Sequence, residues 1–297
     1  MTRFLILGAN GQLGIELQHA LQDFGHVTAY GRAACDLSNP DSIHNAIQNA
    51  HPDVILNAAA YTTVDRAESE PDLAMRVNGE APGILAEEAK THNALLIHYS
   101  TDYVFDGTKS EPWVEEDPTQ PLNVYGATKL AGERNIQQVG GAFFIFRTSW
   151  VFSPHGNNFL LTMLRLGQER EELRIVNDQR GAPTSALALA IATRRILEKT
   201  PKNQLNKLAG IYHMSCAGET TWYGFAQAIF QKSRAERPWA SIIGIPSSEY
   251  PAPAPRPANS VLSNGKLSEV FGVKLPDWES ALETSLRRLD LNTLPSV

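Results

Sequence analysis

Cysteine is almost absent from this chain of 297 residues, which contains only Cys35 and Cys216. Two cysteines cannot build a disulfide framework, and without a Cys-x-x-Cys pair the sequence offers no zinc knuckle. So few cysteines are typical of a protein from a reducing compartment. We therefore expect a cytoplasmic protein without a cysteine-held metal.

Long apolar runs are also missing. No stretch approaches the roughly 20 residues that a transmembrane helix needs. Residues 4–7 form a short apolar run near the start, but one basic residue precedes it and no cleavage site comes before the glycines that follow. We therefore expect neither a membrane span nor a signal peptide.

Basic residues are not in excess. Lys and Arg number 26 against 32 Asp and Glu, which gives a formal net charge of −6. This balance argues against nucleic acid or a membrane surface as the partner. It does not argue against a local basic pocket for a small anionic substrate.

What the first half of the sequence does contain is an alternation of strand and helix signals. Strands are expected at 4–7, 26–30, 53–56, 94–99 and 142–146, and helices at 15–24 and 41–50. The second helix would be capped by Asn39, with Pro40 at its first position. Such alternation indicates βαβ units, and hence an α/β fold with a Rossmann-type, doubly wound parallel sheet.

The second half is less regular. Helices are expected at 158–167, 186–198, 221–233 (capped by Thr220 or Thr221) and 278–289, and strands at 173–176 and 210–214. Residues 251–257 hold four prolines and must be extended, as a linker or as a segment covering a substrate. We expect 1–150 to bind the cofactor, with about 180–215 returning to the sheet. Residues 151–180 and 216–297 would form a smaller, non-contiguous substrate domain.

A glycine-rich loop follows the first strand. Residues 8–14 have the spacing G-x-x-G-x-x-G and open the first helix. Free backbone N–H groups and the positive end of the helix dipole suit a pyrophosphate there, although a plain tight turn is the alternative. The expected cofactor contacts are Gly8, Asn10, Gly11, Gln12, Leu13 and Gly14.

The residues after the second strand indicate which dinucleotide is bound. That strand ends without the Asp or Glu that usually binds the ribose 2′-hydroxyl of NAD. Arg32 follows instead, and its guanidinium matches a 2′-phosphate. Asp36 and Leu37 are expected to bracket the adenine, although Asp36 also reads as a turn residue. The sequence favours NADPH, with NADH as an alternative.

Tyr125 and Lys129 form a Tyr-x-x-x-Lys pair, whose side chains would share one face of a helix. A lysine placed there can hold a cofactor ribose and draw the pKa of the phenol down from about 10. Thr101 follows the fourth strand, at the sheet edge where ligands bind, and its hydroxyl can orient a carbonyl. Each signal is weak alone, but together they predict the reduction of a ketone.

Seven segments spread along the chain carry a family resemblance. They are residues 57–68, 100–105, 121–129, 146–151, 157–159, 178–184 and 256–260. Together they are similar to the extended short-chain dehydrogenase/reductases, and within them to the dTDP-4-dehydrorhamnose reductase family. The resemblance implies NAD(P)H-dependent reduction of the C4 ketone of dTDP-4-dehydro-L-rhamnose to dTDP-L-rhamnose, the last step to a precursor of cell-surface polysaccharide.

The resemblance also implies roles for single residues. Tyr125 would protonate the alkoxide, Lys129 would hold the nicotinamide ribose, and Asn78 would support a water at the lysine. Further implied cofactor contacts are Ala58, Ala59, Ala60, Tyr61 and Thr62, and the three alanines are small enough to leave room for a flat ring. Implied substrate contacts are Thr101, Asp102, Tyr103, Trp150, Asn157 and Arg256. The guanidinium of Arg256 suits the diphosphate, although a core tryptophan and a linker arginine remain alternatives for Trp150 and Arg256.

Two other functions are compatible with this fold. One is a sugar-nucleotide dehydratase or epimerase, but the dehydratase would need a glutamate where this chain has Tyr103, which argues against dehydration. A non-catalytic subunit, resembling the regulatory partner of methionine adenosyltransferase, would keep the cofactor fold. The intact set of Thr101, Tyr125 and Lys129 argues for turnover instead.

The sequence departs from the family at a metal site. Some members bind Mg²⁺ at a dimer interface, through glutamates of the first helix and of the helix after Gly-Ala-Pro-Thr. Glu16 is present here, but residues 185–189 contain no carboxylate. One carboxylate is a poor cage for a hard cation. We therefore expect no bound metal, Glu16 on a solvated helix face, and a monomer or weak homodimer.

Overall fold

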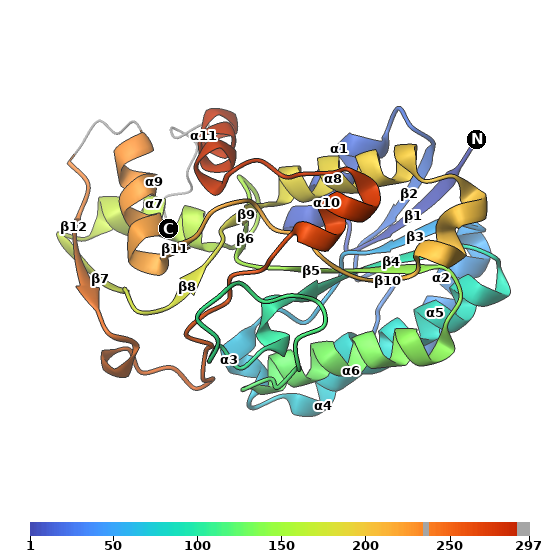
Figure 1. Cartoon of the computed structure of the whole chain (residues 1–297), viewed down its shortest axis with the longest axis horizontal. Coiled ribbons are helices and arrows are strands. Elements are labelled where there is room, and N and C mark those ends of the chain that lie inside the picture. Colours follow the sequence, from blue (N-terminus) through green and yellow to red (C-terminus); the bar gives the residue numbers. More distant parts are fainter. Residues whose placement is uncertain (234–237, 290–297) are drawn as a thin grey trace.

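The computed structural model describes residues 1–233 and 238–289 (Figure 1). Its centre is a six-stranded sheet in the order β10-β5-β4-β3-β1-β2, and all neighbouring strands are parallel. The strands are β1 (Arg3–Leu7), β2 (His26–Tyr30), β3 (Val54–Asn57), β4 (Leu95–Thr101), β5 (Phe143–Thr148) and β10 (Gly210–His213). The predicted doubly wound parallel sheet is confirmed.

Helices cover both faces of this sheet. On one face α1 packs against α8, and on the other α5 packs between α2 and α6 (Figure 1). Their bounds are α1 (Gln12–Leu21), α2 (Pro40–Ala50), α5 (Ala81–Thr91), α6 (Val124–Val139) and α8 (Ala186–Lys199). Side chains alternate between the faces of a strand, so Phe4 and Ile6 of β1 join the core under α1, while Leu5 and Leu7 join the core under α2 and α5.

The other end of the molecule is built from shorter elements. Helices α7 (Phe159–Glu169) and α9 (Trp222–Lys232) pack together beside a parallel pair, β7 (Glu172–Val176) and β12 (Ser241–Ile245). Figure 1 shows this group at the end away from β2. Two-residue strands connect it to the large sheet: β6 (Val151–Phe152), β8 (Arg180–Gly181), β9 (Thr184–Ser185) and β11 (Thr220–Thr221). Helices α10 (Gly265–Phe271) and α11 (Trp278–Arg288) complete the described chain.

Element boundaries differ from the sequence expectation mainly at the first helix. It begins at Gln12 rather than Ile15, because Gly11 is its N-cap, and it ends at Leu21. Asn39 caps α2 and Thr221 caps α9, as predicted. Several short elements had no sequence signal: α3 (Val64–Ala67), α4 (Pro71–Met75), the π-helical turn η1 (Arg76–Glu80), and the 3₁₀ turns η2 (Asp102–Val104), η3 (Lys202–Leu208) and η4 (Ser247–Glu249).

Among residues 1–233 and 238–289, no helix combines the length and the apolarity that crossing a membrane requires.

Candidate active site

The glycine-rich loop that follows β1 packs against the segment that follows β3. Gly8 has a φ of 88°, and a Cβ on it would lie 2.8 Å from the Ala59 nitrogen. A Cβ on Gly14 would lie 2.0 Å from the Gly8 carbonyl oxygen. Only glycine fits at these two positions, so the loop can lie directly against the backbone after β3.

The first turn of α1 is open to an anion. No side chain caps it, no acidic residue lies in that turn, and Gly11 at the cap is exposed. Uncapped N–H groups and the helix dipole therefore point out of the loop, which fits the pyrophosphate of a dinucleotide. The Leu13 side chain is buried in the core, and Gln12 Oε1 accepts a hydrogen bond from Ser153 Oγ at 3.1 Å.

The residues expected to select the cofactor lie beyond β2. The Arg32 side chain is 76% exposed, and its Nε lies 3.5 Å from Asp36 Oδ2. Asp36 also accepts hydrogen bonds from the backbone and hydroxyl of Ser38, which lower the pKa of its carboxyl. Leu37 is buried. Arg32 is thus the accessible member of this group.

The segment after β3 is fixed by Asn78 of η1. Asn78 Oδ1 accepts from the Tyr61 nitrogen at 2.8 Å, and Asn78 Nδ2 donates to the Tyr61 carbonyl at 3.0 Å. The same amide nitrogen lies 3.3 Å from Thr128 Oγ1 of α6. The amide of Asn78 therefore clamps the loop that carries Ala58 to Thr62. Its expected support of a water at the lysine stays a prediction. Thr62 itself is exposed.

Thr101 and Tyr125 are brought together by a glycine contact. Asn123 caps α6 by accepting from the Gly126 nitrogen, which places Tyr125 in the first turn. A Cβ on Gly126 would lie 2.2 Å from the Tyr103 carbonyl oxygen, so only glycine lets α6 approach the end of β4 this closely. The rings of Tyr103 and Tyr125 meet edge to face, with centroids 5.8 Å apart.

Burial dominates the titration of these groups. It raises the pKa of Tyr125 to about 12, although a hydrogen bond with Thr101 acts in the opposite direction. It raises the pKa of Asp102 to about 6, and Asp102 Oδ1 accepts from Thr101 Oγ1 at 2.9 Å. Burial also raises the pKa of Tyr103. The Tyr125 phenol is therefore protonated, and so a proton donor, throughout the neutral range.

Lys129 faces the sheet. Its side chain is almost fully buried, and its Nζ lies 2.6 Å from the Tyr99 carbonyl oxygen and 3.0 Å from His98 Nε2. Burial lowers the pKa of Lys129 to about 8. Burial dominates the pKa of Tyr125 here, and Lys129 is not among the groups that shift it. The expected lowering of that pKa by the lysine stays a prediction.

A cavity of about 1040 Å³ lies between α7, β7, α9 and the proline-rich segment, and Thr101, Tyr125 and Lys129 are not among the residues that line it. Arg256 lines it and forms an ion pair with Asp65 of α3, with 2.9 Å between Nη2 and Oδ2. Asn123 Nδ2 donates to the Pro255 carbonyl at 2.8 Å. The proline-rich segment is thus a wall of the cavity held against the site, which favours the covering segment over the linker.

The two remaining expected substrate contacts, Trp150 and Asn157, do not line this cavity. Trp150, with a φ of 47°, stacks on Trp222 at 3.6 Å between ring centroids, and it is Trp222 that lines the cavity. Asn157 is exposed in a loop, while its neighbour Asn158 caps α7. Trp222 had no sequence signal, because nothing local marks which tryptophan faces the cavity.

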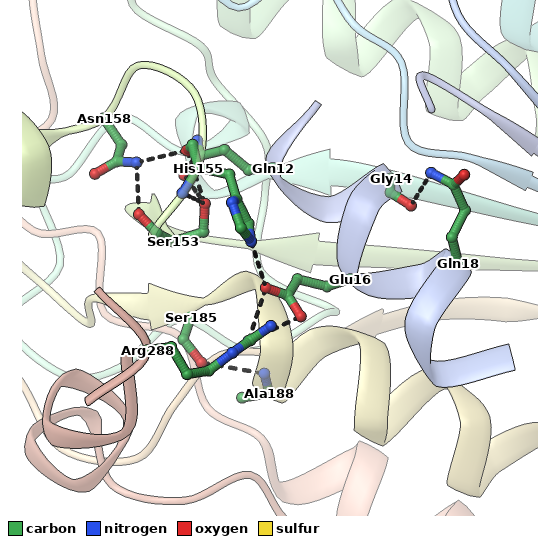
Figure 2. A network of polar contacts seen from close by, with 10 residues as sticks. All are labelled: Gln12, Gly14, Glu16, Gln18, Ser153, His155, Asn158, Ser185, Ala188 and Arg288. Carbon is green, nitrogen blue, oxygen red and sulfur yellow. Dashed lines mark hydrogen bonds and ion pairs between the residues drawn. The ribbon is translucent and has the colours of Figure 1, made fainter. Parts of the chain in front are cut away.

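Glu16 does not lie on a solvated helix face, and this expectation was wrong. Its side chain is fully buried, and its two carboxylate oxygens accept from Arg288 Nη1 of α11 at 2.8 and 2.9 Å (Figure 2). His155 Nε2 lies 3.5 Å from Oε1. Within residues 1–233 and 238–289 there is no cluster of three or more His, Cys, Asp or Glu suited to a metal ion.

Comparison with known proteins places this chain in a family. The family model described as RmlD substrate binding domain matches residues 2–291. A dTDP-4-dehydrorhamnose reductase of Burkholderia thailandensis is 50% identical over 295 residues, which are 97% of this chain and 99% of the relative. The enzyme of the same name from Escherichia coli K12 is 45% identical, over 97% and 98% of the two chains.

Solved structures of dTDP-4-dehydrorhamnose reductases have the same fold as this chain. A dTDP-4-dehydrorhamnose reductase of Bacillus anthracis in complex with NADP superposes with a TM-score of 0.89 at 35% identity, covering 97% of this chain and all of the other. The corresponding protein of Clostridium acetobutylicum gives a TM-score of 0.89 at 36% identity, covering 96% and 98%. The fold, the glycine loop and the full-length matches lead to one conclusion: this chain belongs to the dTDP-4-dehydrorhamnose reductase family.

Proposed function

We propose that this chain reduces the C4 ketone of dTDP-4-dehydro-L-rhamnose to give dTDP-L-rhamnose, with NADPH as the reductant. The observation that carries the proposal is the protonated Tyr125 phenol beside the Thr101 hydroxyl, at the end of β4. The intact trio of Thr101, Tyr125 and Lys129 supports turnover rather than a regulatory role. Tyr103 occupies the position at which a dehydratase would need a carboxylate.

The residues present fit a dinucleotide. The uncapped first turn of α1 and the close approach at Gly8 and Gly14 suit a pyrophosphate, and exposed Arg32 suits a 2′-phosphate. When bound, the reduced nicotinamide supplies a hydride to the carbonyl carbon. Ala58 to Thr62, held by Asn78, would form the floor of the cofactor site.

The chain's own residues would handle the proton and the charge. Thr101 orients the carbonyl oxygen, and Tyr125 gives it a proton as negative charge develops there. A positioned acid contributes typically about 10²–10⁴-fold to a rate. Arg256 would bind the diphosphate of the substrate, and the cavity behind it would take the nucleoside.

The cavity also supports the proposed division of the chain. Its lining comes from residues 159–179, Trp222 and 245–256, whereas the glycine loop belongs to the first βα unit. We also propose that the protein is cytoplasmic and that it is a monomer or a weak homodimer. Cys35 and Cys216 are both free and buried, which fits a reducing compartment.

The central test is a set of variants assayed by NADPH oxidation with and without dTDP-4-dehydro-L-rhamnose. Tyr125→Phe removes one oxygen, so kcat should fall roughly 10²–10⁴-fold while the Kd for NADPH stays within a few-fold. Thr101→Val should cost less, because the proton donor remains. Lys129→Met should weaken NADPH binding as well as turnover.

Tyr212→Phe is the matched control, because the Tyr212 hydroxyl donates to the Leu208 carbonyl, away from the site. Its kcat should equal that of the wild type. A near-normal kcat in Tyr125→Phe would assign the proton to another group, and absence of substrate-dependent oxidation in the wild type would overturn the proposed reaction.

A further inference from the structure

Three buried polar side chains in and beside the sheet form a continuous chain of contacts that the proposed reaction does not use. Asn57 ends β3, His98 lies in β4 and Lys129 lies in α6, and each is about 1% exposed. Asn57 Nδ2 lies 3.0 Å from His98 Nδ1, and His98 Nε2 lies 3.0 Å from Lys129 Nζ. Buried polar groups of this kind are costly unless every contact pairs a hydrogen with a lone pair.

The groups at the two ends of this chain of contacts fix the direction of its hydrogen bonds. At one end the Ala59 backbone N–H, which can only donate, reaches Asn57 Oδ1 at 3.3 Å. At the other end Lys129 Nζ reaches the Tyr99 carbonyl, which can only accept, at 2.6 Å. Asn57 Nδ2 must then donate to His98 Nδ1. A neutral imidazole that accepts at Nδ1 carries its proton on Nε2 and donates from there.

The remaining contact is between His98 Nε2–H and Lys129 Nζ. An ammonium has three hydrogens and no lone pair, so it cannot accept this hydrogen bond, whereas a neutral amine can. We infer that Asn57 and His98 are positioning residues that favour the neutral amine of Lys129 over the ammonium, so that this lysine loses its proton at a lower pH than an ordinary lysine does. We also infer that the lysine and the imidazole tautomer titrate as one unit. This inference goes beyond the proposed function and does not depend on it.

The electrostatic surroundings are consistent with this assignment. Burial lowers the pKa of Lys129 to about 8 and keeps the pKa of His98 well below its usual value. Glu133, one turn along α6, acts in the opposite direction on Lys129, but its carboxylate also accepts from Arg147 of β5 and from Ser100 of β4. Its charge is therefore shared with a buried guanidinium.

The alternative arrangement leaves a conflict. If Lys129 is an ammonium and donates to His98 Nε2, a neutral ring carries its proton on Nδ1. The Asn57 amide must then turn its oxygen toward His98, and its NH₂ group would face the Ala59 N–H. Two donors would meet in a buried site, so protonation of the lysine should break the chain and change the His98 tautomer in the same step.

Nitrogen NMR of the ligand-free protein tests the inference directly. In histidine-labelled protein, two-bond correlations distinguish the two tautomers, and His98→Gln identifies the His98 signals by difference. At pH 9 we expect His98 to carry its proton on Nε2. In lysine-labelled protein, with Lys129→Met for assignment, the Lys129 signal should titrate near pH 8, and the His98 tautomer should change at the same midpoint.

Asn57→Asp is the most informative variant, because it reverses the directions of the hydrogen bonds from residue 57 to Lys129 and keeps the shape of the side chain. A carboxylate accepts from both the Ala59 N–H and His98 Nδ1–H, so Nε2 becomes an acceptor and Lys129 an ammonium. The Lys129 midpoint should rise by at least one pH unit, and His98 should carry its proton on Nδ1 at pH 9. In His98→Gln the amide NH₂ can still donate to the lysine, so the low Lys129 midpoint should persist.

Two results would overturn the inference. One is a wild-type His98 with its proton on Nδ1 at pH 9. The other is a Lys129 midpoint near that of an ordinary lysine, about 10.4. Both measurements use the wild-type protein, so they stand even if Asn57→Asp fails to fold, and neither outcome depends on whether the chain is a reductase.

Discussion

Asp102 shows how burial sets the properties of a single residue in this site. Its side chain is 3% exposed, and burial raises the pKa of its carboxyl from 3.8 to about 6. One of its oxygens, Oδ2, has no hydrogen-bond partner among the described residues. The folded protein therefore binds the Asp102 proton more tightly than the unfolded chain does.

This preference makes the stability of the protein depend on pH. A raised carboxyl pKa gives stability that is complete below about pH 4 and is lost as the pH rises through 6. Between pH 4.5 and 8 the loss from this one group should be about 2 kcal/mol. Asp102→Asn removes the titration, so its free energy of unfolding should fall less over this range, measured by urea denaturation.

Asp41→Asn, at an exposed position in the first turn of α2, is the control for that experiment. Its curve should run parallel to that of the wild type. If the Asp102→Asn curve is also parallel to the wild type, the carboxyl is already ionised at pH 4.5 in the folded protein.

Arg32 is the residue that we propose to select the cofactor. Its guanidinium is largely exposed and paired with Asp36, an arrangement that costs little to rearrange around a phosphate. Arg32→Ala should raise the KM for NADPH roughly 10-fold, because it removes about one charge-assisted hydrogen bond to the 2′-phosphate. The KM for NADH should stay nearly unchanged. Arg165→Ala removes another exposed arginine of an i,i+4 pair and should change neither. An equal response of the two cofactors would show that Arg32 does not contact the 2′-phosphate.

At the scale of elements, the proposed cofactor floor depends on a turn that is neither strand nor regular helix. The π-helical turn η1 joins α4 to α5 and directs Asn78 at the loop after β3. Asn78→Ala would leave the Tyr61 N–H and carbonyl unpaired. We expect a loss of about 2–3 kcal/mol in the free energy of unfolding, together with a higher Kd for NADPH, measured by fluorescence titration.

Asn135→Ala separates this effect from simple loosening of η1. Asn135 Nδ2 donates to the Gly79 carbonyl at 2.9 Å, so it also ties α6 to η1 but does not touch the loop. It should lower stability modestly and leave the Kd unchanged. Equal Kd values for the two variants would mean that the loop does not form the cofactor floor.

Local patterns explain why the main elements could be predicted from the sequence. The glycine spacing at 8–14, the caps at Asn39 and Thr221, and the four-residue spacing of Tyr125 and Lys129 each lie within one or two turns of chain. Contacts between distant residues gave no such signal. Asn57 and His98 are 41 residues apart, and Glu16 and Arg288 are 272 apart, so neither pairing is visible before the chain is folded.

At the scale of the whole molecule, the first and last described helices are joined through a buried charge. Glu16 lies in α1, which the glycine-rich loop opens, and Arg288 is the final residue of α11, which also packs against α9 (Figure 1). Figure 2 shows that the same region includes His155 and Ser153, whose hydroxyl reaches Gln12 in the loop. The ion pair thus links the helix that follows the glycine-rich loop to the elements around the cavity.

Removing Arg288 should therefore destabilise the protein as a whole. Breaking a fully buried pair costs about 3–5 kcal/mol, because an uncompensated charge remains. The Arg288 side chain is 34% exposed, so we expect Arg288→Ala to lower the free energy of unfolding by about 2 kcal/mol, measured by urea denaturation.

Arg287→Ala, one residue earlier on the exposed side of α11, should stay within about 0.5 kcal/mol of the wild type. Adding Glu16→Gln to Arg288→Ala removes the stranded carboxylate and should recover part of the loss, because the two effects are coupled. If Arg288→Ala and Arg287→Ala unfold alike, Glu16 has enough other compensation, and the link between the two helices contributes nothing to stability.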